Sequence, residues 1–386
     1  MQIKIPTEAT IAACEEALQL LSETTTDAEI DLVTTHKYQG AGGDLSWAQL
    51  LLTWAQKSEH RTLRTYLGQN PTSEKLQSVC SSLLNLIAIL CSDKVENGQQ
   101  QRQDETLLSK SEAINQLSRL QTKRADAATK GPSISVVAAD SLGFGSPDSL
   151  YVTASPGHKT LGNRDYFVRA SDRIFKRIAP NDRKLHSNPL ISNAFGTLLY
   201  ELFKNTEDHA LQDIDGKRLA QCFRVFRADY VSMEKNSLLN STADYAPLNA
   251  YYDQFMPGQG RKHLNFISLS VLDSGPGYAQ TWTRQPFEEL TEEEEKAATI
   301  RCFSNGTSKH SDRYGKGLPL TRNILRQQKG FLRLRTGRQS LFYSGSNDLN
   351  PDIEIPLHSW APQSNVKLAR VHGTLISILL PVSGTK

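Results

Sequence analysis

The segment Leu264–Gly277, with the sequence LNFISLSVLDSGPG, decides the fold of the second half of the chain. The run up to Leu272 is apolar and predicts a buried β-strand. The strand brings Asp273 to its end, and Gly275 and Gly277 follow. A carboxylate there can accept a hydrogen bond from an exocyclic amine such as N6 of adenine, and glycine lets the backbone approach a flat ring closely. In isolation, the same residues are also typical of a tight turn after a strand.

A second motif lies upstream, in a segment predicted to be helical from about Asn193 to Ala210. Glu201 and Asn205 are four residues apart, so their side chains lie on one face of the helix. The side chains that hold this helix on a sheet are apolar: Leu198, Leu199, Leu202 and Phe203. A carboxylate beside an amide oxygen can orient a water molecule and bind Mg²⁺, which prefers oxygen ligands. Taken alone, the pair is indistinguishable from an ordinary solvated pair.

A third motif is the polar, glycine-bounded segment Gly306–Leu320, which runs into an amphipathic helix predicted over Leu318–Gln328. Glycine-rich backbone at a helix N-terminus presents free N–H groups and partial positive charge to phosphate oxygens. Pro319 fits the first helical turn, where no N–H is needed. Three cations of this segment can add charge near a triphosphate or remain solvated: Lys309, Arg313 and Lys316. The segment is not a Walker loop, because no hydroxyl residue follows the lysine.

A fourth motif is Gly373-Thr374, which opens a buried strand predicted over Thr374–Leu380. Thr374 can place a hydroxyl beside Asp273 and a water molecule bound there. Without the other three motifs, this one predicts only the start of a strand.

Together and in this order, the four motifs resemble those of the GHKL superfamily, which includes gyrase, a heat-shock chaperone, histidine kinases and MutL. The resemblance covers residues 190–381. It matches Glu201 and Asn205 to the N box and Gly373-Thr374 to the threonine that closes the adenine pocket. It matches the remaining motif residues to the two glycine boxes: Asp273, Gly275 and Gly277 to the first, Gly315 and Gly317 to the second.

The resemblance implies an α/β fold of the Bergerat type: a two-layer sandwich of a mixed sheet with helices on one face, and a lid over ATP at about residues 296–316. It implies that Asn205 holds Mg²⁺, that Asp273 reads adenine and that Glu201 is the general base. The β- and γ-phosphates are then held by the backbone amides around Gly315, Lys316, Gly317 and Leu318. This favours an ATPase that uses lid closure as a conformational switch.

Two features depart from the family pattern. The interval between Asn205 and Asp273 is long, which predicts an insertion or long loop over residues 235–262. Pro319 stands where many members have glycine. The acidic run at residues 288–296 is interpreted as a solvated helix face rather than a metal site.

Two other functions stay open: a protein kinase of the anti-sigma or histidine-kinase type, and a regulatory module that binds ATP without turnover. Against the histidine-kinase form, neither His36 nor His60 lies in a phosphoacceptor motif, since Lys-Tyr and Arg-Thr follow them.

The N-terminal third matches no motif. Residues 1–92 are predicted to be mostly helical, with one short strand at Glu29–Thr35 and helices at Leu45–Gln56 and Ser73–Cys91. Residues 93–131 are polar and predict an exposed connecting helix, and residues 132–386 form the ATP-binding domain. We expect another protein or a second copy of the chain to bind the N-terminal region or the connecting helix.

Composition indicates which ligands, redox environment and membrane association to expect. The net charge is +3, from 44 basic and 41 acidic residues. This balance does not indicate nucleic-acid binding, which would have to depend on a local basic patch. Five cysteines without metal-ligand spacing predict free thiols in a reducing cytoplasm. The apolar run Val79–Cys91 is shorter than the roughly 20 residues that cross a bilayer. A cytoplasmic protein without a membrane segment is expected.

Overall fold

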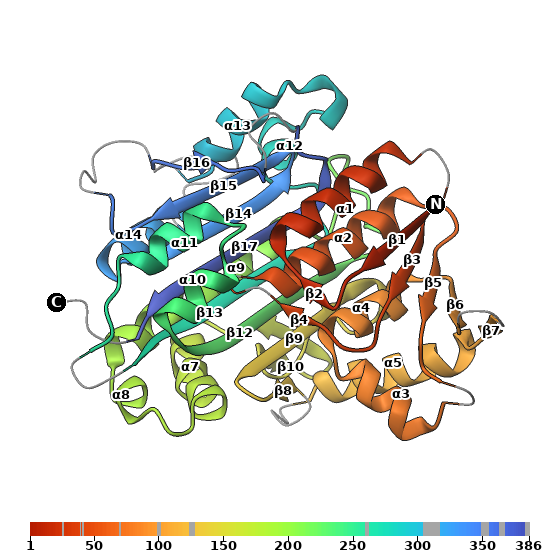
Figure 1. Ribbon diagram of the computed structural model, residues 1–386, viewed down its shortest axis with the longest axis horizontal. Coiled ribbons are helices and arrows are strands. Elements are labelled where there is room, and N and C mark those ends of the chain that lie inside the picture. Colours follow the sequence, from red (N-terminus) through yellow and green to blue (C-terminus); the bar gives the residue numbers. More distant parts are fainter. Residues whose placement is uncertain are drawn as a thin grey trace.

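The computed structural model has a mixed α/β fold, as the sequence predicts at this level (Figure 1). The residues that it describes are 1–24, 27–38, 40, 42–68, 71–98, 102–122, 128–258, 262–303, 317–348, 355–362 and 367–382. Two sheets organise the chain: an eight-stranded sheet built from residues 129–381 and a five-stranded sheet built from residues 2–104.

The larger sheet has the strand order β16-β15-β14-β17-β13-β12-β9-β8. Its strands are β8 (Thr129–Lys130), β9 (Ser133–Ala139), β12 (Phe223–Glu234), β13 (His263–Asp273), β14 (Phe331–Gly337), β15 (Gln339–Ser344), β16 (His358–Ser359) and β17 (Val371–Pro381). Every neighbouring pair is antiparallel. The expectation of a mixed sheet is therefore wrong. Short links such as the single residue between β14 and β15 allow only antiparallel pairing.

One face of this sheet is covered by α7 (Arg164–Ile178), α9 (Pro189–His209) and α14 (Gly317–Gln327). α9 begins where the Asn188 side chain accepts hydrogen bonds from the first-turn amides and Pro189 occupies the first helical turn. Its apolar side packs on the sheet; Leu198 and Leu202 share a buried cluster with Leu269 and Ile376. The same helix carries Glu201 and Asn205 toward the end of β13. Short α8 (Arg183–His186) links α7 to α9.

The opposite face is also covered, so the expectation of helices on one face is wrong. α2 (Gly43–Lys57) crosses this face, and Leu272 and Leu375 of the sheet belong to the same buried cluster as its leucines. Gly42, the N-cap residue of this helix, has a φ of 79°, and a β-carbon there would come within 2.0 Å of Ser377 Oγ. A side chain at this position would therefore push α2 away from the sheet.

The described residues of the predicted insertion, 235–258 and 262, form no simple loop on this face. They fold into α10 (Lys235–Ser241) and α11 (Ala246–Asp253). Tyr245, Tyr251 and Tyr252 are buried there against Phe266 and Phe331 of the sheet. The expected insertion therefore exists, but aromatic burial gives it secondary structure of its own.

The N-terminal unit is built on the order β1-β3-β5-β6-β7, in which the first four strands are parallel. The strands are β1 (Gln2–Ile5), β3 (Glu29–Leu32), β5 (Thr62–Thr65), β6 (Lys94–Asn97) and β7 (Gln103–Asp104), and a separate pair joins β2 (Glu8–Ala9) to β4 (Lys37–Tyr38). Its other helices are α1 (Ile11–Glu23), α3 (Ser73–Cys80), α4 (Leu83–Cys91) and α5 (Thr106–Leu120). The prediction of a mostly helical region missed this sheet.

The connecting helix predicted within residues 93–131 is α5, and it belongs to the N-terminal unit. Ala113 and Leu117 are fully buried in that unit's core, because α5 packs on α3 and α4. Leu107 and Leu108 at its start are exposed. The predicted helix Ser73–Cys91 is two helices, bent by 102°. Among the described helices, none is by itself long and apolar enough to cross a membrane, although α3 and α4 pass that test as a bent pair.

Candidate functional site

Three of the four motifs meet at one small cavity of about 40 Å³ between α9 and the strands β13 and β17. Helix α12 (Tyr278–Thr283) closes one side. Four predicted site residues line the cavity: Asn205, Asp273, Gly277 and Thr374. The rest of the lining is partly apolar and partly polar: Leu202, Thr206, His209, Ala210, Val271, Tyr278, Thr281 and Ile376. Asn205 is thus brought beside residues far along the chain.

Asp273 is the central polar group of this cavity. Its Oδ1 accepts hydrogen bonds from the backbone N–H of Gly275 at 2.8 Å and of Thr374 at 3.3 Å. Within the described part of the chain, Oδ2 accepts none. Burial raises the pKa of the carboxyl to about 6, and the two backbone N–H groups and Arg224 act in the opposite direction. One carboxylate oxygen is therefore fixed by the fold while the other remains for a ligand.

Glycine is required where β13 ends against the start of β17. Gly373 has a φ of 74°, and a β-carbon there would come within 1.8 Å of the Asp273 carbonyl oxygen. Its N–H donates to the carbonyl of Gly275 at 2.8 Å. Gly277 has a φ of 87°, and a β-carbon there would meet Thr336 Oγ1 at 2.7 Å. The motif glycines therefore hold the two chain segments close enough for Asp273 and Thr374 to share one cavity.

Hydroxyl groups surround the carboxylate. Thr374 Oγ1 lies 3.2 Å from Thr336 Oγ1, which also accepts from the Tyr278 N–H at 3.4 Å. Burial raises the pKa of the Tyr278 hydroxyl, and the side chain of Asn205 acts in the opposite direction. Sequence reasoning missed Tyr278, although its position directly after Gly277 was the available signal.

Glu201 lies just outside the cavity lining, one helical turn before Asn205. It is buried and forms an ion pair with Arg164 at the start of α7. The backbone of Gly317 lies against it, since a β-carbon at Gly317 would come within 2.6 Å of Glu201 Oε2. Gly317 of the second glycine box therefore lies in contact with Glu201 of the N box. Arg164 carries no sequence signal, because it is the first residue of an ordinary amphipathic helix.

Other predicted site residues are less well placed. Gly315 and Lys316 lie outside the described residues, as does the predicted lid from residue 304 onward. Leu318 is described, and its side chain is buried in the core beneath α14, so only its backbone can face a ligand. The lid's first residues belong to α13 (Glu292–Arg301).

The acidic run before the lid is a helix start. Glu294 completes a capping box with Thr291, and Glu295 is buried in an ion pair with Arg338 at 2.8 Å. The predicted helix is confirmed, although Glu295 is buried and not solvated as expected. No cluster of three or more His, Cys, Asp or Glu side chains suited to a metal occurs in the described ranges.

The N-terminal unit touches the site through α2. Gln49 Nε2 donates to the carbonyl oxygens of Arg335 at 3.1 Å and of Gly373 at 3.4 Å. Thr53 Oγ1 accepts from the His372 N–H at 3.0 Å. These contacts, which the sequence did not indicate, fix the strand that carries Thr374.

Comparison with family models, curated proteins and solved structures finds no match to this chain. The chemistry of the site follows from its residues. A buried carboxylate with one uncommitted oxygen and hydroxyl groups nearby suits a ligand that donates a hydrogen bond, and a cavity of about 40 Å³ must widen before it admits a flat ring.

Proposed function

We propose that this chain binds ATP with Mg²⁺ in the cavity beside Asp273 and hydrolyses it. The observation that carries the proposal is the uncommitted Oδ2 of Asp273 in a cavity that Asn205, Gly277 and Thr374 also line. In this proposal, the layer of α7, α9 and α14 on the eight-stranded sheet corresponds to the Bergerat-type sandwich. The N-terminal unit is then an additional layer on the other face.

Adenine recognition is assigned to Asp273. Asp273 lines the cavity, and its Oδ2 accepts no hydrogen bond from the described residues, so this oxygen can accept one from a ligand such as the adenine amine. Leu202, Val271 and Ile376 provide apolar contacts for the ring. The Thr374 hydroxyl, held by Thr336, can fix a water molecule between the ring and the carboxylate.

The phosphate end is assigned to Asn205, Gly317 and Leu318. Mg²⁺ takes one or two protein oxygens and completes its shell with water and phosphate, so the Asn205 amide oxygen fits it without a carboxylate cluster. When bound, Mg²⁺ would neutralise charge on the phosphates. The free N–H groups at the start of α14 can hold phosphate oxygens at the same end of the site.

Hydrolysis is assigned to Glu201. A water oxygen attacks the γ-phosphorus, the bond to the β-phosphate oxygen breaks, and Glu201 takes the proton of the water. ADP and phosphate are the products. The ion pair with Arg164 orients Oε1 of the Glu201 carboxylate. The backbone of Gly317 lies against Oε2 and limits its movement. Closure of the lid after ATP binds would act as the conformational switch.

The fate of the γ-phosphate tests this proposal. We expect the purified chain with γ-labelled ATP and Mg²⁺ to release free labelled phosphate. Label retained on protein would support a kinase instead, and bound ATP with neither outcome would support a regulatory module. Glu201→Gln should stop release while ATP still binds, and Asp208→Asn, an exposed acid on the same helix, is the matched control. Undiminished release by Glu201→Gln would remove the assignment of the base.

A further inference from the structure

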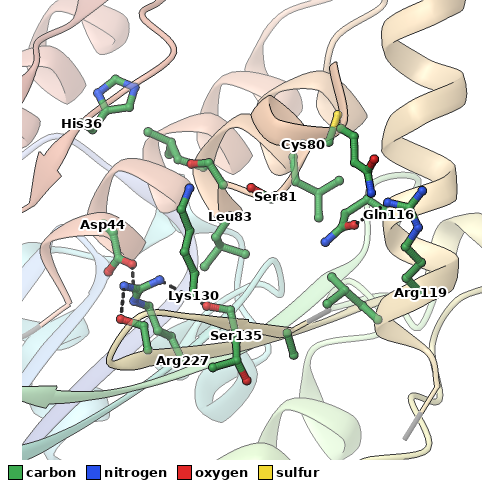
Figure 2. Close-up of a pocket in the computed structure, with 18 of the residues that line it drawn as sticks. His36, Asp44, Cys80, Ser81, Leu83, Gln116, Arg119, Lys130, Ser135 and Arg227 are labelled. Carbon is green, nitrogen blue, oxygen red and sulfur yellow. Dashed lines mark hydrogen bonds and ion pairs between the residues drawn. The ribbon is translucent and has the colours of Figure 1, made fainter. Parts of the chain in front are cut away.

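A second and larger cavity, of about 630 Å³, lies between the N-terminal unit and the β8–β9–β12 edge of the eight-stranded sheet (Figure 2). Its volume falls in the range of small-molecule sites, which often lie between structural units. Ser133 and Ser135 of β9 line the sheet side, and the junction between α3 and α4 lines the opposite side. The proposed ATP site uses none of its lining residues.

Lys130 is the cation of this cavity that remains for a ligand. Arg227 is neutralised by Asp44, with Nε 2.6 Å from Oδ2, and by Asp229 at 2.7 Å. Arg119 faces Glu112, 3.4 Å away. Among the described residues, Lys130 forms no ion pair. Figure 2 shows its side chain extending into the cavity, with the ammonium group directed toward the helices of the N-terminal unit.

The start of α4 lines the same cavity. Ser81, Ser82 and Leu83 contribute to the lining, and the Ser82 side chain makes no capping hydrogen bond. The first N–H groups of a helix have no intrahelical acceptor, and they carry partial positive charge. Lys130 and the first turn of α4 therefore offer two kinds of anion-binding group to one space.

The rest of the lining is suited to the body of a small molecule. Leu83, Leu86 and Leu120 supply apolar surface, and Thr34 and Thr35 add hydroxyl groups. A free inorganic anion would leave most of a cavity of this volume unfilled. The combination favours an anionic group attached to a body that has both apolar and hydroxyl surface.

We propose that this cavity binds a small phosphate monoester of the size of a nucleoside monophosphate. Its phosphate lies between Lys130 and the first turn of α4, and its body lies against Leu83 and Leu120. This part of the proposal does not require that the chain hydrolyse ATP.

Helix α2 extends the proposal to regulation. It contributes Asp44 to this cavity, and five residues later Gln49 donates to the Gly373 carbonyl beside the candidate ATP site. A ligand that shifts the Asp44–Arg227 pair is therefore expected to change ATP affinity through α2, and ATP must change the ligand's affinity by the same factor. This second part rests on the proposed function.

Calorimetric titration of the full chain with uridine monophosphate tests the binding site. We expect binding that is about tenfold weaker or worse for uridine, which lacks the phosphate, and for Lys130→Ala. Lys75→Ala, an exposed lysine on α3 outside the cavity, and Asp273→Asn should bind uridine monophosphate like the unaltered chain. Lack of binding at millimolar concentration would overturn the proposal. So would binding that Asp273→Asn abolishes and Lys130→Ala leaves unchanged.

The regulatory part is tested by titrating ATP in saturating uridine monophosphate. We expect the ATP dissociation constant to change at least about threefold, and Gln49→Leu to remove the change. An ATP dissociation constant that does not change would overturn coupling through α2. A chain that binds uridine monophosphate but no ATP at all would instead overturn the proposed function.

Discussion

The backbone of Gly317 lies against the carboxylate of Glu201, so closely that a β-carbon at position 317 would come within 2.6 Å of Oε2. The contact joins the start of α14 to the middle of α9, two helices that both pack on one face of the eight-stranded sheet. It means that the residue at position 317 sets the position of the group assigned as the general base.

Gly317→Ala is expected to displace the Glu201 carboxylate rather than to unfold the chain. The crowded atom is the end of a flexible side chain, and alanine favours the helix by about 1 kcal/mol over glycine. Phosphate release from ATP should fall at least about tenfold, with ATP affinity changed much less. Steady-state turnover and equilibrium ATP titration measure the two effects. Asn323→Ala, exposed on the same helix, is the control, and equal turnover by both variants would contradict the assignment.

Asp273→Asn is expected to stabilise the fold at pH 7. The carboxyl has a pKa of about 6 in the folded chain against 3.8 for the ordinary group, so the folded state binds the proton more tightly. The contribution of the Asp273 carboxyl to the free energy of unfolding therefore falls as pH rises from 4 to 6, by about 3 kcal/mol in total. Asparagine keeps an oxygen for the Gly275 and Thr374 N–H groups and does not ionise. Urea unfolding at pH 4 and pH 7 measures the difference, and a variant that is equally destabilised at both values would contradict this account.

ATP binding is expected to weaken as pH falls through about 6. Protonation removes the negative charge of Asp273, which is the better acceptor for the adenine amine. ATP itself also titrates in this range, so the unaltered chain is compared with Asp273→Asn. The ATP affinity of that variant should not show the additional loss near pH 6. ATP titrations between pH 5 and 8 measure the effect. Identical pH profiles for the two chains would show that Asp273 is not the adenine-binding group.

Glu15→Ala is expected to destabilise the chain by about 3–5 kcal/mol. Glu15 on α1 accepts from Arg335 Nε at 2.9 Å, and Arg335 is only 1% exposed on β14. Removal of the carboxylate leaves a buried guanidinium without its counter-charge between the N-terminal unit and the larger sheet. Glu16→Ala, exposed on the next position, should change stability by less than about 0.5 kcal/mol. Chemical unfolding of both variants measures this, and similar midpoints would contradict it.

Sequence patterns locate the elements next to the candidate site well. The predicted strands Leu264–Leu272 and Thr374–Leu380 lie within β13 and β17, and the helix after the second glycine box is α14. Long apolar runs and amphipathic helices carry a strong periodic signal. Glycines that need positive φ, such as Gly277 and Gly373, carry a signal of their own.

Tertiary relationships carry no comparable signal. β5 and β6 are four residues long, with the sequences TLRT and KVEN, too short and too polar for a periodic pattern. Arg333 and Arg335 are buried in β14, where hydropathy alone predicts exposure. Glu15 of α1 pairs with Arg335 at 2.9 Å and lies 3.8 Å from Arg333, which also donates to Ser46 Oγ. The pairing of Arg164 with Glu201 likewise depends on how α7 packs on α9.

Equilibrium binding of ATP in the presence of Mg²⁺ to the unaltered chain and to Asp273→Asn tests the central claim most directly. The account predicts one ATP per unaltered chain, and affinity at least about tenfold weaker for Asp273→Asn, which remains folded at pH 7. An unaltered chain that binds no ATP, or an Asp273→Asn chain that binds it equally well, would contradict the claim.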